Sequence, residues 1–209
     1  MTGSRRKPAP RPRRRPPSTD PASVVRRGAG RVVAGELRGR RFDLPPTSIT
    51  RPTSDRVREA TFNALDSLGA VRGARVVDPF AGSGALGIEA LSRGATHATF
   101  AERDPAARAV LGSNVATLGL ADRATVVPGD GSRVLAGGGP WDLVLLDPPY
   151  GFDEWDELLV AVVAHLAATG VAVVESDREI ALPGALQFFR TKQYGGTVVA
   201  FASVTGAPS

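Results

Sequence analysis

The chain has 209 residues, a mass of 21.7 kDa and a formal net charge of +5, with 42% hydrophobic and 22% charged residues. These values suit a globular protein that buries its own core, and they exclude a wholly disordered, collagen-like or small secreted disulfide-stapled protein. Because the chain has no cysteine and only two histidines, His97 and His165, it has no disulfide and no thiolate nucleophile, and we expect no metal site.

The positive charge is concentrated at the N-terminus. Residues 1–28 hold nine basic residues and one acidic residue, a net charge of +8, whereas the rest of the chain has a net charge of −3. Six prolines and few apolar residues fall within residues 8–21, so we predict that residues 1–28 form a disordered basic tail. Such a tail favours attachment to a polyanion such as RNA, and the alternative is a solvated extension without a partner.

Residues 29–70 predict a small N-terminal extension made of a hairpin and a helix. Two short extended runs, 31–35 and 40–44, flank a turn that contains Gly39, and this pattern is typical of a β-hairpin. The hairpin is rich in arginine, which indicates a surface that faces a polyanion.

A helix is predicted after the hairpin. Thr53 or Ser54 can cap its N-terminus, and apolar residues keep helical spacing up to Gly69, which ends it. We interpret the arginines of the hairpin and of this helix as contacts for RNA phosphates. These residues are Arg38, Arg40, Arg41, Arg51, Arg56 and Arg58. The alternative is a solvated face, with Arg58 and Glu59 serving fold contacts.

Strands and helices alternate from residue 71 onward, and this predicts a doubly wound parallel sheet in one α/β domain, residues 71–209. The chain ends in two strand-like runs, 186–193 and 197–204, which predict an antiparallel hairpin at the sheet edge. The other predicted strands are 74–77, 98–101, 124–127, 141–146 and 171–175, and the predicted helices are 85–92, 105–118 and 154–167.

The longest uncharged run, residues 158–174, is interrupted by His165 and Gly170. A bilayer span needs about 20 apolar residues, so we expect a helix, a glycine stop and a buried strand here. No apolar stretch follows the basic N-terminus, so we do not interpret it as a secretory signal. We therefore expect a cytoplasmic protein that does not contact a membrane.

A glycine-rich loop follows the first strand of the alternating region. The segment from Asp78 to Gly87 reads D-P-F-A-G-S-G-A-L-G, which contains G-x-G-x-x-G, and Glu102 lies 20 residues after Gly82 at the end of the next strand. Glycines let the backbone approach a nucleotide-type ligand, and a carboxylate at the second strand tip accepts hydrogen bonds from ribose hydroxyls. The alternative is a tight strand-to-helix turn with solvated acids.

Asp78 discriminates between two cofactors. The pyrophosphate of NAD favours a helix N-terminus without a competing carboxylate, whereas Asp78 stands four residues before Gly82. The same carboxylate suits the ammonium and sulfonium groups of S-adenosylmethionine, and Asp130, after the third strand, is placed to reach the adenine amine. We therefore predict an S-adenosylmethionine site formed by Asp78, Pro79, Phe80, Gly82, Gly84, Glu102 and Asp130.

The fourth strand ends in the tetrapeptide D-P-P-Y, residues 147–150. Ligands of open α/β sheets bind at the carboxyl ends of the strands, so the tetrapeptide is expected beside the cofactor. Its two prolines remove two N–H donors and leave carbonyls, a carboxylate and an aromatic ring. Such a set fits a planar group that bears an NH₂.

The tetrapeptide supplies the predicted catalytic residues Asp147, Pro148 and Tyr150. An exocyclic base amine is a poor nucleophile, because its lone pair is delocalised into the ring. Hydrogen bonds from its two N–H groups to Asp147 and to the Pro148 carbonyl would make the nitrogen more tetrahedral and aim its lone pair at the methyl donor. Tyr150 would stack on the base. The alternative is a proline turn with Tyr150 in packing, and Phe152 and Trp155 either shape the base pocket or pack.

These motifs resemble those of a known family. D-P-P-Y after the fourth strand, with D-P-F-A-G-S-G-A-L-G-I-E-A-L-S-R-G-A after the first, is similar to the class I S-adenosylmethionine-dependent amino-methyltransferases. The hairpin sequence R-V-V-A-G-E-L-R-G-R-R-F and the block from Arg51 to Asn63 narrow the resemblance to the RsmD family. It runs from about Arg31 to Val204, so the basic tail falls outside it.

The resemblance implies a fold, a reaction and partners. The fold is a Rossmann-like, seven-stranded, mostly parallel sheet with a reversed last strand and a small N-terminal extension that touches RNA. The reaction is methylation of the N2 amine of a guanine in 16S rRNA, position 966 in the family's naming. The partner is 16S rRNA in the small ribosomal subunit or its assembly intermediate, and we expect a monomer.

Two other functions stay open at this point. Another amino-methyltransferase would act on DNA adenine or on a protein glutamine, but glutamine enzymes typically carry N-P-P-Y, and DNA enzymes usually add a recognition domain for which we expect no room. A non-catalytic RNA-binding or ribosome-assembly factor would keep a vestigial site, which the intact acids, glycines and D-P-P-Y disfavour.

Overall fold

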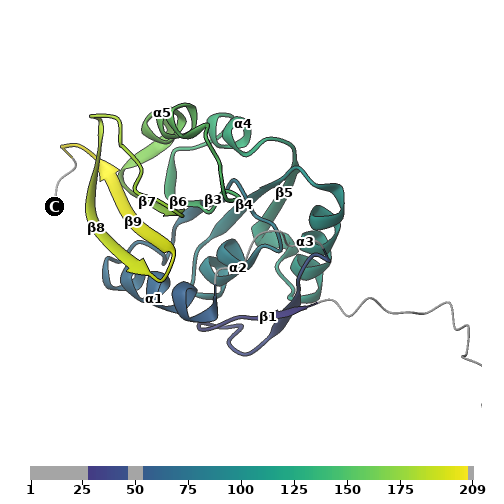
Figure 1. Cartoon of the computed structure of the whole chain (residues 1–209). Helices are drawn as coiled ribbons and strands as arrows, with labels where there is room; N and C mark the ends of the chain where they lie inside the picture. Colours follow the sequence, from purple (N-terminus) through teal and green to yellow (C-terminus); the bar gives the residue numbers. More distant parts are fainter. Residues whose placement is uncertain (1–27, 47–53, 207–209) are drawn as a thin grey trace, which may run out of the picture.

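The computed structural model describes residues 28–46 and 54–206, so almost all of the predicted tail and Arg51 lie outside the described residues. Its centre is a seven-stranded sheet with the order β5-β4-β3-β6-β7-β9-β8 (Figure 1). The strands are β3 (Arg75–Asp78), β4 (His97–Glu102), β5 (Ala124–Pro128), β6 (Trp141–Leu146), β7 (Leu166–Ser176), β8 (Leu186–Tyr194) and β9 (Thr197–Val204), and a separate hairpin pairs β1 (Ala29–Arg31) with β2 (Arg41–Asp43).

The strands of the sheet run parallel except for β9, the last strand of the chain. Strands β3 to β7 pair in parallel, whereas β9 runs antiparallel to both β7 and β8. Strand β9 is therefore the reversed strand, placed between β7 and β8, and the two last strands form a hairpin at the sheet edge. This confirms the Rossmann-like sheet that the sequence predicted.

Helices cover both faces of the sheet (Figure 1). Val76 is buried in the core under α1, α2 and α3, and its neighbour Val77 is buried in the core under α4 and α5, because successive side chains of a strand point to opposite faces. Burial on both faces explains the continuous apolar run of residues 143–146 in β6. The helices are α1 (Asp55–Ser67), α2 (Ala85–Ser92), α3 (Pro105–Thr117), α4 (Gly131–Ala136) and α5 (Trp155–His165), and a short 3₁₀ helix, η1 (Ala121–Arg123), precedes β5.

The N-terminal hairpin differs from the prediction in its extent. Strand β1 ends at Arg31, whereas the predicted strand covers 31–35. The backbone N–H groups of Val33 and Ala34 donate to the Glu89 carboxylate of α2, at 2.8 and 3.0 Å. These two amides therefore fix the segment to α2 instead of continuing the ladder with β2.

The extension shares the core of the α/β domain. Val32 and Phe42 of the hairpin segment, with Phe62 and Leu65 of α1, are buried in the same cluster as Leu91 of α2. Side chains from residues 29–70 are therefore part of the packing under the sheet. The turn of the extension lies at the end of α2, where the Leu37 N–H donates to Ser92, and among the described residues of the extension only Leu44 and Pro45 reach the carboxyl ends of the strands.

Two other element boundaries differ from the sequence prediction. Helix α4 was missed, because six residues carry too little apolar periodicity to be recognised. The helix predicted over 154–167 ends at His165, since β7 begins at Leu166 and is eleven residues long. Within residues 28–46 and 54–206, every helix is too short or too polar to cross a lipid bilayer.

Candidate active site

A cleft of about 440 Å³ opens at the carboxyl ends of β3, β4, β5 and β6. A smaller depression adjoins it and shares Asp147, Pro149 and Phe152 with it; the predicted residues Pro148 and Tyr150 line only this depression. Of the predicted site residues, the cleft brings together Asp78, Pro79, Phe80, Gly82, Glu102, Asp130 and Asp147, and Gly84 is not among its lining residues.

Some walls of the cleft come from residues that sequence reasoning missed. Leu44 and Pro45, which follow β2, reach the cleft from the N-terminal extension. Ala107 of α3 and Ser132 of α4 line it from the far side of the glycine loop. None of these residues belongs to a motif, so only the folded arrangement identifies them.

The glycine loop turns sharply between β3 and α2. Gly82 and Gly84 have positive φ angles of 53° and 87°, a backbone region that L-residues with a side chain rarely adopt. A Cβ on Gly84 would also lie 2.5 Å from Leu111 of α3. Gly84 therefore shapes the turn and allows α3 to pack against it, while Gly82 presents its backbone to the cleft.

Glu102 holds the glycine loop in place. Its Oε2 accepts a hydrogen bond from the Gly82 N–H at 2.8 Å, and its Oε1 accepts one from the Asp104 N–H at 2.8 Å. Each carboxylate oxygen has two lone pairs, so both oxygens keep capacity for a ligand. The carboxylate at the tip of β4 thus connects the loop after β3 to the loop before α3.

Asp78 is the buried acid of the cleft, with 1% of its surface exposed. Its Oδ2 accepts a hydrogen bond from the Gly87 N–H at 3.1 Å, while its buried Oδ1 has no hydrogen-bond partner of normal geometry among the described residues. Burial raises the pKa of Asp78 from 3.8 to about 7; the amides of Gly87 and Phe80 lower it, and the negative charges of Asp147 and Glu102 add to the rise.

The hydrogen-bond acceptors of the cleft fit S-adenosylmethionine. The unpartnered Oδ1 of Asp78 is an acceptor for a cationic ligand group, and Glu102 and Asp130 line the same cleft as acceptors for hydroxyl or amine groups. A Cβ on Gly131 would lie 2.0 Å from the Pro79 carbonyl oxygen, so glycine is needed where the loops after β3 and β5 meet. Asp130 is exposed and caps α4 by accepting from the Arg133 N–H at 3.1 Å.

Aromatic rings connect the glycine loop to the D-P-P-Y loop. Phe80 meets Phe152, and Phe152 meets Trp155, with 5.3 Å between ring centroids and edge-to-face angles of 71° and 89°. Phe152 also closes the turn after the tetrapeptide, because its N–H donates to the Pro149 carbonyl at 3.1 Å. Tyr150 is 56% exposed, so its ring is accessible to a stacking partner.

Four of the predicted RNA-contacting arginines lie on the surface. Arg38, Arg40, Arg41 and Arg56 are exposed, and Arg40 donates to the Thr117 carbonyl of α3 at 3.1 Å. These guanidinium groups are therefore accessible to phosphates. Arg51 lies outside the described residues.

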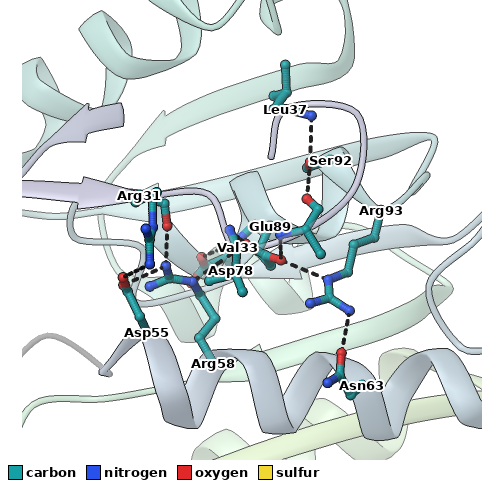
Figure 2. Close-up of polar contacts among 12 residues, drawn as sticks. Arg31, Val33, Leu37, Asp55, Arg58, Asn63, Asp78, Glu89, Ser92 and Arg93 are labelled. Atoms are coloured by element: carbon teal, nitrogen blue, oxygen red, sulfur yellow. Dashed lines mark hydrogen bonds and ion pairs between the residues drawn. The ribbon is translucent and has the colours of Figure 1, made fainter. Parts of the chain in front are cut away.

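The prediction for Arg58 is wrong. Its side chain is buried, with 2% of the residue exposed, and it forms ion pairs with Asp55 at 3.0 Å and with Glu89 at 3.7 Å (Figure 2). A buried guanidinium that is satisfied by carboxylates has no access to RNA phosphates. Its position on the inner face of α1, next to the fully buried Phe62, explains why it serves the fold.

Glu89 organises a buried network that sequence reasoning missed. Its fully buried carboxylate accepts from the Val33 and Ala34 amides and from Arg93 Nε at 2.8 Å, and it pairs with Arg58 (Figure 2). Glu89 lies five residues after Gly84, on the helix that begins at the glycine loop. Helix α2 therefore contacts the candidate cofactor site at its start and the N-terminal extension near its end.

Comparison with known proteins identifies the family. Residues 30–203 match the sequence profile of a family described as Conserved hypothetical protein 95. The chain belongs to the RsmD family. This confirms the resemblance that the glycine loop, the D-P-P-Y tetrapeptide and the N-terminal block indicate, and the fold is that of class I methyltransferases.

The RsmD relatives cover most of the chain. Ribosomal RNA small subunit methyltransferase D of Escherichia coli (strain K12) is 42% identical over 159 residues, which are 75% of this chain and 79% of the relative. YlbH of Bacillus subtilis (strain 168) is 38% identical over 185 residues, 84% of this chain and 100% of the relative. The solved structure of yhhF from Escherichia coli is 37% identical, with a TM-score of 0.75, and the match covers 85% of this chain and 98% of that one.

Proposed function

We propose that the chain transfers a methyl group from S-adenosylmethionine to the exocyclic N2 amine of a guanine in 16S rRNA. One observation carries the proposal: Asp147 lines both the cleft that holds the acids and glycines of the predicted cofactor site and the depression that holds Pro148 and Tyr150. The relatives named ribosomal RNA small subunit methyltransferase D support small-subunit rRNA as the substrate.

Asp78, Glu102 and Asp130, with the backbone of the glycine loop, would hold the cofactor. When bound, S-adenosylmethionine supplies a methyl group on a positively charged sulfur. The carboxylates match its cationic and hydroxyl groups, and a bound cationic group would favour the ionised form of the buried Asp78. The chain's own contribution at this side of the site is therefore binding and orientation.

Asp147 and Pro148 would activate the base amine. Their carboxylate and carbonyl oxygens accept the two N–H groups of the amine, which localises its lone pair on nitrogen and orients it for in-line attack. Formation of the new N–C bond leaves a proton on the amine, and the Asp147 carboxylate can take it. Tyr150 stacks on the extruded base and holds its ring plane.

The exposed arginines of the extension would orient the RNA. Phosphate contacts fix the register of a nucleic acid but read no sequence, which suits Arg38, Arg40 and Arg41 on the hairpin segment. We also propose that the chain acts as a monomer in the cytoplasm, on the small subunit or on its assembly intermediate.

The direct test is transfer of a labelled methyl group to small ribosomal subunits that lack this modification, followed by nucleoside analysis. We expect label in N2-methylguanosine of 16S rRNA. Label in N6-methyladenine after incubation with DNA would favour another amino-methyltransferase. A chain that neither transfers methyl nor binds S-adenosylmethionine would instead be a non-catalytic RNA-binding factor.

Asp78→Asn is expected to stabilise the free protein at pH 8 and to weaken its binding of S-adenosylmethionine. The folded pKa of about 7 lies above the unfolded value of 3.8, so the wild-type fold loses stability as pH rises from about 4 through 7, and the neutral amide avoids this loss. The measurement is the unfolding temperature of both proteins from pH 5 to pH 8, without ligand. Curves that stay parallel would contradict the raised pKa.

Replacing Arg38, Arg40 and Arg41 together by alanine is expected to weaken RNA binding and to flatten its salt dependence. Each lost phosphate contact lowers the slope of log K against log salt by about 0.7 to 0.9, so three contacts would lower it by about 2. Lys192→Ala is the control, because it removes an exposed cation from β8. This strand lies at the opposite edge of the sheet from β5, which follows Arg123, the partner of the hairpin residue Glu36. Binding that is unchanged across salt would reject the RNA role of the hairpin.

A further inference from the structure

The depression beside the cleft carries polar groups that amine activation leaves unused. Besides Asp147 and Tyr150 it is lined by Glu175 and Trp155. Glu175 lies near the end of β7, and Trp155 is the first residue of α5. The following inference rests on the proposed function, because it takes the amine of the target base to lie at Asp147.

Asp147 and Glu175 lie side by side. Strands β6 and β7 are parallel neighbours, and Leu146 is in register with Val174. The next residue on each chain is therefore an acid, and neighbouring strands are about 4.8 Å apart. Both residues line the same depression, so two acidic residues lie next to each other at its wall.

Two adjacent carboxylates match guanine and not adenine. The Watson–Crick edge of guanine presents two donors next to each other, the N2 amine and N1–H, followed by the acceptor O6. In adenine the ring nitrogen beside the exocyclic amine is an acceptor. A carboxylate is only an acceptor when ionised, so Glu175 beside Asp147 would accept from guanine N1–H and would repel the lone pair of adenine N1.

A buried donor completes the pattern. Trp155 is 7% exposed, and its indole Nε1 is buried with no hydrogen-bond partner within residues 28–46 and 54–206. A buried N–H without an acceptor is costly and points to a missing partner. With the exocyclic amine at Asp147, guanine places its O6 acceptor on the other side of N1, where adenine has only C2–H, so O6 fits this donor.

We propose that Glu175 selects guanine by accepting a hydrogen bond from N1–H, and that Trp155 donates from Nε1 to O6. Glu175 is then a specificity-determining residue for the base, distinct from Asp147, which holds the reacting amine. A site that is built to hydrogen-bond a substrate N–H rejects an analogue that lacks it.

The test compares guanine with 2-aminopurine at the target position of the RNA. 2-Aminopurine keeps the reacting amine but has an unprotonated N1 and no O6. We expect the wild-type chain to prefer guanine about a hundredfold. In Glu175→Gln the side-chain amide can accept from N1–H or donate to N1, so the preference for guanine over 2-aminopurine should fall by a factor of about ten. Differences in intrinsic reactivity of the two bases cancel when the proteins are compared.

Trp155→Phe provides a second, independent measurement. It keeps an aromatic ring but removes the N–H, so methylation of guanine should slow while methylation of 2-aminopurine changes little. Glu179→Gln, at an exposed acid four residues beyond Glu175 that lines neither hollow, is the matched control and should keep the wild-type preference. S-Adenosylmethionine binding by every variant verifies that each one is folded.

The outcomes separate the inference from the proposed function. A wild-type chain that methylates no guanine in any RNA would overturn the proposed function. A wild-type chain that methylates guanine, with the same preference over 2-aminopurine in Glu175→Gln and Trp155→Phe, would overturn the inference alone, since a purely structural role slows both substrates equally.

Discussion

Asp147→Ala is expected to lower methyl transfer at least about a hundredfold and to leave S-adenosylmethionine binding nearly unchanged. The substitution removes the acceptor that localises the lone pair of the base amine, whereas Asp78, Glu102 and the glycine loop, which are proposed to hold the cofactor, are unchanged. The measurements are single-turnover transfer of labelled methyl to small subunits and calorimetric titration of the cofactor.

The same loop offers a matched control for Asp147. Asp153 is exposed and lines neither the cleft nor the depression, so Asp153→Ala removes one negative charge nearby and should keep transfer within about twofold. Asp147→Asn retains one acceptor oxygen and should lose less activity than the alanine variant. Wild-type turnover by Asp147→Ala would refute amine activation by this residue.

The elements of the sheet could be predicted from the sequence because their signals are local, whereas the order of the strands has no local signal. The bounds of α2 and β6 agree with the prediction, since a glycine loop begins the helix and the apolar run 143–146 forms most of the strand. The reversed last strand agrees with what the family resemblance implies. The short glycine turn explains the antiparallel pairing of β8 with β9, whereas the place of β9 between β7 and β8 has no local signal.

The composition of the cleft was predictable where a motif places a residue at a strand tip. Asp78, Glu102 and Asp130 follow three strands that are neighbours in the sheet, so parallel pairing alone brings them to one edge. Leu44 and Pro45 could not be predicted. They reach the cleft because Asn114 of α3 forms two hydrogen bonds with the backbone of Asp43, which is a long-range contact without a local pattern.

The error at Arg58 has the same physical origin. A sequence of exposed arginines resembles a phosphate-binding surface, and nothing local distinguishes the one arginine that turns inward. Its partner Glu89 lies 31 residues later, on a helix that is otherwise mostly apolar and that begins at the glycine loop. The sequence alone does not show that this acid is buried. The pairing of a buried arginine with a buried glutamate can be identified only when the fold is known.

Glu89→Ala is expected to destabilise the fold by about 3–5 kcal/mol, because it removes the buried carboxylate that two buried guanidinium groups share. Arg58 and Arg93 would lose a shared partner, and the Val33 and Ala34 amides would lose their acceptor. For a chain of this size the loss corresponds to an unfolding temperature lower by roughly 10 °C. Thermal unfolding monitored by circular dichroism measures it.

In Glu89→Ala we expect the N-terminal extension to detach from α2 at temperatures below the unfolding temperature of the whole chain. Because Glu89 fixes the Val33–Ala34 segment to α2, limited proteolysis of Glu89→Ala below its unfolding temperature should cut within residues 32–40 faster than in the wild-type chain. Glu59→Ala, an exposed acid on α1, controls for the loss of one negative charge and should change the unfolding temperature by only about 1 °C. If Glu89→Ala behaved like Glu59→Ala in both measurements, the buried carboxylate would not be what attaches the extension to the α/β domain.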